Sequence, residues 1–120
     1  MTPRPDQSLG KTERLLKRCE FLRLSRQGKS TGNRYFVAAF KSNGRDFSRL
    51  GITVTRKTGK AVVRNRIKRF VREFFRQNRH LLGPGVDINV IAKKAAADAT
   101  GGQVFSALRQ LFERIGGHTN

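Results

Sequence analysis

The middle of the chain carries apolar residues at a helical spacing. The residues that recur every three or four positions are Val63, Ile67, Phe70, Val71 and Phe74. At the pitch of an α-helix this spacing places them on one face, which would pack against a core. We expect the helix to begin near Lys60 and to end before Leu81, because a break at Gly83-Pro84-Gly85 follows.

Alternating apolar positions predict three strands. The first, residues 34–41, is apolar on both faces, so we expect it in the centre of a sheet. The second, residues 49–55, has large apolar side chains on one face and small ones on the other, which indicates one face against helices and one open face. The third, residues 86–92, is mostly apolar and should be interior. Asn43-Gly44, between the first two, is a strong hairpin signal.

Two further helices complete the predicted elements. Residues 18–27 form a short helix that Gly28 ends, and residues 29–33 read as a loop of turn formers. After a connection of small residues (95–102), an amphipathic helix begins at Gln103 and stops at Gly116-Gly117. The order is α, β, β, α, β, α, with room for one short strand that the pattern does not place. The class is α+β, a small sheet backed by helices.

Positive charge is concentrated on the predicted central helix. Residues 56–79 hold ten of the 26 Lys and Arg residues and a single acid, Glu73. Like charges four residues apart, such as Arg64 and Lys68, repel by roughly 0.2–0.5 kcal/mol per pair. Most runs of charged residues form a helix face that is simply exposed to water. Such faces usually carry both positive and negative side chains, whereas this helix carries almost only positive ones. With a net charge of +18 and a pI near 11.8, the chain is expected to bind a polyanion, with nucleic acid as the first candidate.

The composition of the chain indicates where the protein is expected to act in the cell. No apolar run approaches the ~20 residues of a membrane-spanning helix, and the N-terminus lacks the apolar core of a signal peptide. Cys19 is the one cysteine, so we expect a small buried hydrophobe in a cytoplasmic protein rather than a disulfide or a zinc ligand. We divide the chain into a flexible N-terminal arm (1–11), a single nucleic-acid-binding domain (12–117) and a flexible tail (118–120).

Residues for catalysis by the protein itself are missing. A metal-dependent nuclease needs clustered carboxylates, whereas the eight Asp and Glu residues are scattered along the chain. Paired histidines would suit acid–base cleavage, but His80 and His118 fall near a helix end and in the tail. We therefore predict no catalytic residue, no metal site and no cofactor bound by the protein for chemistry.

The most specific motif is residues 64–69 (RNRIKR), followed by Arg72-Glu73 and a phenylalanine. Supporting features occur in a fixed order around it: Phe21 and then Gly28, the strand at 50–57, Gly59, Ala61-Val62, the strand at 86–94 and a terminal amphipathic helix. In this combination the chain, over roughly residues 15–115, resembles the protein subunit of bacterial ribonuclease P.

The resemblance implies a fold and a role. The fold would be a compact α/β sandwich of order αβββαβα, with a mixed sheet and a left-handed βαβ crossover around the basic helix, as in ribosomal-protein-like RNA-binding folds. The partners would be a large catalytic RNA, which uses magnesium ions to remove the 5′ leader of precursor tRNA, and that leader itself. The protein would contribute binding and no bond chemistry, with no membrane and no obligate protein partner.

The resemblance also implies site residues. Those expected to bind the catalytic RNA are Arg56, Lys57, Lys60, Arg64, Asn65, Arg66, Lys68, Arg69, Arg72 and Arg76. Two have a second interpretation: Asn65 could cap a local turn, and Arg66 could orient the helix through Glu73 instead of touching RNA.

A cleft for the leader would lie between the first helix and the open face of the sheet. Its implied residues are Phe21, Tyr35, Val37, Ala39, Thr53 and Thr55. Strand alternation independently puts residues 35, 37 and 39 on one face. Ser25 and Ala39 depart from the pattern, because many members carry an aromatic at the first position and a larger residue at the second. Phe21 and Tyr35 can also be ordinary core residues, as we expect of Phe36, Phe40, Phe70 and Phe74.

Two other functions share the charge pattern. A ribosomal protein, or another structural RNA binder, would have the same basic helix but would not need an open aromatic cleft. A DNA-binding helix is a third interpretation, although no helix-turn-helix pairing precedes it.

Overall fold

The structure is a computed structural model that describes residue 14 and residues 17–119, with side chains described as far as residue 117. Its order of main elements is αβββαβα, as the resemblance implies, and short 3-10 helices lie between them. The elements are α1 (Arg18–Gln27), β1 (Lys29–Gly32), β2 (Phe36–Ser42), β3 (Arg49–Thr53), η2 (Arg56–Thr58), α2 (Ala61–Asn78), η3 (Arg79–Leu81), β4 (Val86–Ala92), η4 (Lys94–Asp98) and α3 (Gly101–Thr119).

The strands form one mixed sheet in the order β1-β2-β4-β3. β2 pairs antiparallel with β1 and β4, whereas β3 pairs parallel with β4 at the edge of the sheet. The register aligns Ala39, Asn89 and Gly51 across the three strands β2, β4 and β3. The predictions of a central first strand and an interior last strand are confirmed, and β3, α2 and β4 form the predicted βαβ unit.

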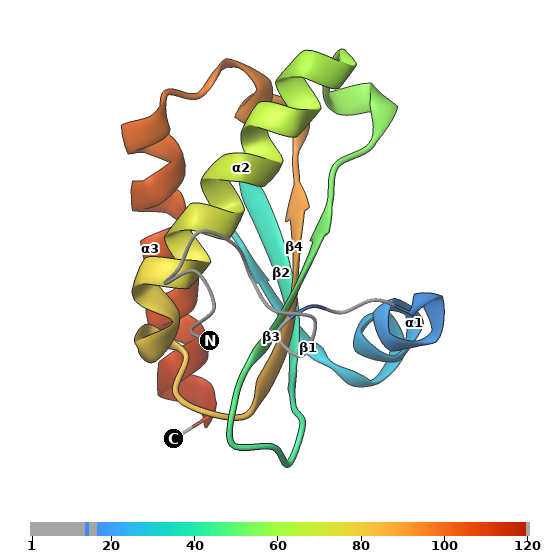
Figure 1. The fold of residues 1–120 in the computed structure, drawn as a ribbon, viewed down its shortest axis with the longest axis vertical. Helices are drawn as coiled ribbons and strands as arrows, with labels where there is room; N and C mark the ends of the chain where they lie inside the picture. Colours follow the sequence, from blue (N-terminus) through green and yellow to red (C-terminus); the bar gives the residue numbers. More distant parts are fainter. Residues whose placement is uncertain (1–13, 15–16, 120) are drawn as a thin grey trace, which may run out of the picture.

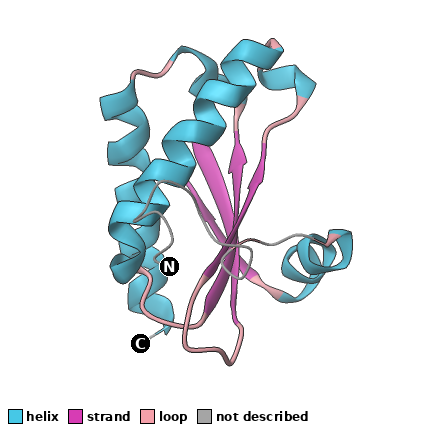
Figure 2. Ribbon diagram, in the orientation of Figure 1, coloured by secondary structure: helices cyan, strands magenta, loops and turns pink. Residues whose placement is uncertain are grey.

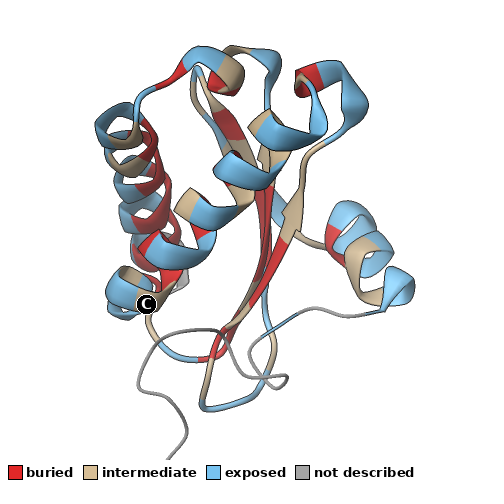
Figure 3. Ribbon diagram, turned by 45° about the horizontal axis from the view of Figure 1, so that its top comes forward, coloured by how far each residue is buried: buried red, intermediate tan, exposed pale blue. Residues whose placement is uncertain are grey.

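Helices cover both faces of the sheet (Figures 1 and 2). α2 and α3 lie together on one face and α1 lies alone on the other. The main core fills the space between the sheet and the helix pair, where the rings of Phe74 and Phe112 meet edge to face at 5.0 Å. Ile67, Val71 and Phe74 of α2 are fully buried, which confirms the predicted apolar face, and the opposite side of α2 is largely exposed (Figure 3).

α1 packs on the sheet through a second, smaller cluster. Leu24 and Ala39 are buried there, with Phe21 half-buried beside them. Gly28 ends the helix as predicted, and its N–H donates to the Leu24 carbonyl at 3.0 Å. A Cβ at Gly28 would lie 2.7 Å from the carbonyl oxygens of both Leu24 and Phe40, so only glycine permits this close approach of α1 to β2.

The hairpin prediction at Asn43-Gly44 is wrong. β2 and β3 are not neighbours, because β4 lies between them. Asn43 does form a turn: its Oδ1 accepts from the Arg45 N–H at 2.8 Å and its Nδ2 donates to Asp87 Oδ1 at 2.7 Å. A turn signal reports that the chain reverses, not which strands then pair. The hairpin of this sheet joins β1 to β2 around Asn33.

Two boundaries also differ from the prediction. β1 is the strand that the pattern did not place, and it occupies residues predicted to be a loop. α3 begins at Gly101 and continues through Gly116-Gly117 to Thr119, although these glycines were expected to stop it. Gly116 is buried in the contact with η3, where a Cβ would collide with the Leu81 carbonyl oxygen. Its absent side chain serves packing and not termination.

The predicted flexible arm, residues 1–11, lies outside the described residues. Arg14 forms an isolated parallel bridge with Leu50 of β3. α3 includes the first two residues of the predicted tail, and Asn120 lies outside the described residues.

Candidate RNA interface

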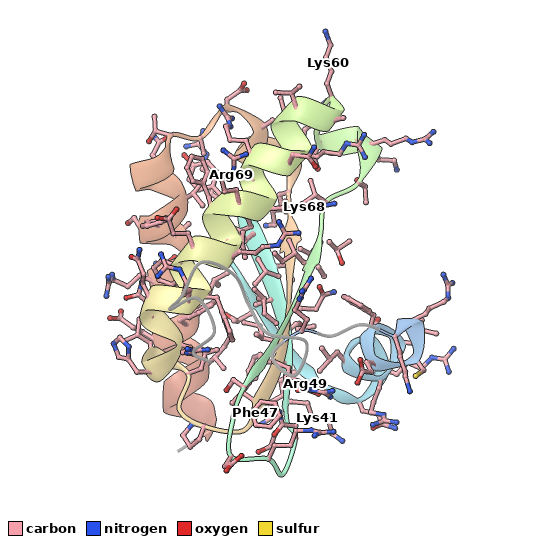
Figure 4. The ribbon with its side chains drawn as sticks, in the orientation of Figure 1. Lys41, Phe47, Arg49, Lys60, Lys68 and Arg69 are labelled. Carbon is pink, nitrogen blue, oxygen red and sulfur yellow. The ribbon has the colours of Figure 1, made fainter. Side chains whose placement is uncertain are left out.

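One surface of the protein is made by the polar residues of η2 and α2. The predicted RNA-binding residues that are exposed there are Arg56, Lys57, Lys60, Asn65, Arg66, Arg69 and Arg72, and those that are half-buried are Arg64, Lys68 and Arg76. Figure 4 shows Lys60 at the start of α2, with Lys68 and Arg69 further along on different sides of the helix. The apolar stripe of α2 is committed to the core, so its cations are left to face outward. We call these ten residues the cationic face.

Local contacts orient part of this face. Arg66 Nη2 donates to the Ala97 carbonyl of η4 at 2.7 Å, while Glu73 forms a long ion pair with Arg76 at 4.0 Å. Arg66 therefore orients α2 through η4, and the interpretation that it pairs with Glu73 is wrong. Arg64 Nε is buried without a hydrogen-bond partner among the described residues. An unsatisfied buried donor costs roughly 1–3 kcal/mol.

A groove of about 500 Å³ lies at the β3 edge of the sheet, between α1 and α2. The residues that line it are Arg18 and Phe21 of α1, Ile52, Thr53 and Val54 on and after β3, and Lys68 of α2. The Thr53 hydroxyl donates to Oδ1 of the buried Asn89 at 3.1 Å. The groove thus combines one aromatic ring, small polar groups and two cations. Lys68 belongs both to the groove and to the cationic face, so the two surfaces are continuous.

The structure brings together part of the predicted cleft. Phe21 and Thr53 line the groove. Ala39 is buried beneath Leu24 of α1, and Thr55 is exposed beyond the end of β3, so neither lines it. Val37 is half-buried on β2 and is not among the groove's lining residues either.

The prediction that Tyr35 shares a cleft with Phe21 is wrong in geometry. Tyr35 precedes β2, in the turn that Asn33 organises, so the alternation of the strand does not extend to it. Its side chain packs against the main core, and it borders α3 on the other side of the sheet.

A network of charges attaches α1 to the sheet beside the groove. Arg49 of β3 donates to Glu20 of α1 at 2.7 Å and makes two hydrogen bonds to Asp87 of β4 at 2.8 and 2.6 Å. The hydrogen bond to Asp87, the largest influence, raises the pKa of Arg49. Burial alone would raise the pKa of Asp87, but hydrogen bonds from Arg49 and Asn43 outweigh it and lower that pKa.

Sequence reasoning missed Arg18, Ile52, Val54 and Asn89. Ile52 and Val54 were predicted to face the helices, and both do pack against the main core. Because β3 is an edge strand, they also line the groove. Asn89 did leave a signal, since it is a lone amide in the apolar run of residues 86–92. A buried amide needs partners, and Thr53 is one.

Three general features bear on function. Within the described part of the chain, no three His, Cys, Asp or Glu side chains gather as a metal site would require. None of the described helices is both long and apolar enough to cross a membrane. Cys19 is exposed, so the expectation that it is a buried hydrophobe is wrong.

Comparison with known proteins points to one family. The family profile described as Ribonuclease P matches residues 9–116. The ribonuclease P protein component of Desulforapulum autotrophicum is 49% identical over 108 residues, which cover 90% of this chain and 92% of the relative. That of Thermotoga maritima is 49% identical over 92 residues, or 77% of this chain and 79% of the relative.

Solved structures similar to this one point to the same family. The ribonuclease P protein from Thermotoga maritima superimposes with a TM-score of 0.80 at 46% identity, covering 86% of this chain and 97% of that one. The Staphylococcus aureus protein gives a TM-score of 0.81 at 38% identity, covering 87% and 95%. These matches decide against the ribosomal and DNA-binding interpretations. The chain belongs to the family of bacterial ribonuclease P protein components, the protein subunit that acts with an RNA in tRNA 5′ processing.

Proposed function

We propose that the cationic face binds the catalytic RNA and that the groove beside it binds the 5′ leader of precursor tRNA. The observation that carries the proposal is the position of Lys68, which lies in both surfaces. A strand that leaves an RNA held on α2 can enter the groove without crossing uncharged surface.

The groove suits single-stranded RNA. Cations track the backbone, and an aromatic ring offers a stacking surface worth roughly 1–3 kcal/mol per base. Arg18 and Lys68 supply the cations on opposite sides of the groove, and Phe21 supplies the ring. The Thr53 hydroxyl proton is donated to Asn89, so its oxygen lone pairs remain to accept a hydrogen bond. Only the precursor has a leader, so these contacts favour precursor over mature tRNA.

Bond chemistry, and the magnesium ions it uses, belong in this proposal to the RNA. Two carboxylates, Glu20 and Asp87, approach the same guanidinium, and both are engaged by Arg49. Such ion-paired groups are poorly placed to hold a metal for hydrolysis. The protein therefore contributes by binding and orientation. Cleavage of precursor tRNA by the protein alone, in magnesium and without the catalytic RNA, would contradict this assignment.

The experiment compares precursor and mature tRNA binding by the reconstituted holoenzyme. Phe21→Leu keeps an apolar side chain against Leu24 and Ala39 but removes the aromatic face. We expect precursor affinity to fall about tenfold, with mature tRNA affinity unchanged. Leu22→Ala is the matched control, because Leu22 is an exposed apolar residue on the same helix that does not line the groove. Equal losses for both tRNAs, or equal effects of both variants, would remove the leader from the groove.

A further inference from the structure

A second hollow lies on the other side of the sheet, where the turn before β2 meets the first half of α3. Its volume is about 570 Å³, within the range typical of small-ligand sites. The residues that matter here are Asn33, Arg34, Tyr35, Thr100, Gln103 and Gln110, and none of the lining residues is acidic. It shares no lining residue with the groove of Phe21.

The amide of Gln110 has a fixed orientation in this hollow. Asn33 Oδ1 accepts from the backbone N–H groups of Tyr35 and Phe36, both at 3.1 Å. Asn33 Nδ2 must therefore be the donor toward α3, and it donates to the Ala107 carbonyl at 2.9 Å and to Gln110 Oε1 at 3.1 Å. The oxygen of Gln110 is thus committed, and its amide nitrogen is the group left to bind a ligand.

The side-chain amide of Gln103 also has a fixed orientation, which hydrogen bonds at the start of α3 determine. Its Oε1 accepts from the Thr100 N–H at 2.9 Å, and its own N–H donates to Thr100 Oγ1 at 3.1 Å. This reciprocal pair is a capping box. It occupies the oxygen of Gln103 and leaves the amide nitrogen and the Thr100 hydroxyl proton as donors at an exposed surface.

Cations and an aromatic ring complete the hollow. The Arg34 guanidinium lies over the Tyr35 ring, 5.6 Å from its centroid. Lys93 Nζ donates to the Asn33 carbonyl at 2.6 Å, and this hydrogen bond holds a further positive charge beside the hollow. The hollow therefore offers donors and positive charge together with a flat stacking surface. A ligand with many acceptors, negative charge and an aromatic face fits this set, and a nucleotide within an RNA strand has all three.

The hollow connects to the cationic face through η4. Arg66 of α2 donates to Ala97 of η4, and Gly101, at the start of α3, packs against Phe70 of α2. An RNA strand bound along α2 can thus continue over η4 to the hollow. We propose that the hollow is a second RNA-binding site, which takes one nucleotide of the catalytic RNA, its base on Arg34 and Tyr35 and its phosphate on Gln103 and Gln110.

Glutamate substitution tests the donors without disturbing the fold. In Gln103→Glu and Gln110→Glu the side-chain oxygens that accept from Thr100 and Asn33 are kept, while each donor nitrogen is replaced by a charged oxygen. Gln27→Glu is the matched control. Gln27 lies on α1, away from the hollow, and its side-chain oxygen also accepts a hydrogen bond, from Lys41 Nζ at 3.3 Å. Affinity for the catalytic RNA alone is measured for each variant at several salt concentrations.

We expect the double variant Gln103→Glu/Gln110→Glu to bind the catalytic RNA about tenfold more weakly, because hydrogen bonds to a charged group are lost. Gln27→Glu should change the affinity by less than about twofold. Equal effects of the double variant and the control would overturn the proposal.

Crosslinking identifies which RNA occupies the hollow. After Cys19→Ser removes the exposed native thiol, Ser106→Cys within the hollow carries a photo-crosslinker. We expect crosslinks to the catalytic RNA, with or without precursor tRNA present. Crosslinks to precursor tRNA only, or to no RNA, would overturn the proposal, and this result is independent of the leader experiment on Phe21.

Discussion

Arg49 of β3 and Asp87 of β4 form a doubly hydrogen-bonded ion pair on the side of the sheet that α1 covers. The distances are 2.8 Å from Nε to Oδ1 and 2.6 Å from Nη2 to Oδ2. The remaining arm of the guanidinium reaches Glu20 of α1 at 2.7 Å. One cation therefore joins two strands to the helix that forms a wall of the groove.

Removal of this cation should destabilise the protein. Arg49→Leu leaves two largely buried carboxylates without their partner, and we expect the free energy of unfolding to fall by about 3 kcal/mol. Urea unfolding measures the loss. Arg23→Leu removes an exposed cation from α1 and should cost less than about 0.5 kcal/mol. A similar loss in both variants would show that net charge, and not the ion pair, governs stability.

Acid should weaken the same pair. The pKa of Asp87 in the folded protein lies below its ordinary value of 3.8, so the unfolded chain binds the proton more readily. The stabilisation is complete above the ordinary pKa and is lost as the pH falls through the folded pKa. Unfolding free energies measured from about pH 6 to pH 2 should fall more steeply in the wild type than in Asp87→Asn. Parallel curves would rule out this contribution.

Adjacent glycines of α3 should respond in opposite directions to alanine. Gly116→Ala places a Cβ against the Leu81 carbonyl and should lower stability by about 1–3 kcal/mol. At Gly117 a Cβ meets nothing within 4 Å, so Gly117→Ala should raise stability by up to about 1 kcal/mol through helix propensity. Thermal unfolding of the two variants compares them directly, and a gain in both would mean that Gly116 does not pack as described.

The cationic face should bind RNA chiefly by charge. Arg69→Ala removes one exposed cation from α2, and we expect weaker binding of the catalytic RNA with a salt dependence reduced by about one counterion. Lys41→Ala removes an exposed cation at the opposite end of the molecule (Figure 4) and should leave both quantities nearly unchanged. Equal salt slopes for the two variants would indicate that RNA binding depends on net charge and not on this face.

Periodic patterns predicted most of the fold. The stripe from Val63 to Phe74 identified α2 and its buried face, because a helix that packs on a core needs apolar residues at its own pitch. α1 was predicted with its observed bounds. β1 was missed because its sequence, KSTG, has no alternation, and the strand depends on backbone pairing with β2.

Contacts between distant segments could not be predicted in this way. Tyr35 continues the alternation of β2 in sequence, but the turn at Asn33 takes it out of the strand and toward α3. The groove was anticipated through Phe21 and Thr53, whereas Lys68 was assigned to the catalytic RNA alone. Lys68 reaches the groove because β3 is an edge strand and α2 lies beside it. The order of strands in a sheet cannot be predicted from a local sequence pattern.

The close approach at Gly28 has a consequence for binding. The C-terminal end of α1 rests against the backbone of β2, and Arg49 holds the helix again at Glu20. The helix is anchored at both places before any RNA arrives, so the groove is preorganised. The entropy of ordering its walls is lost when the protein folds, and binding then has to order only the nucleic acid.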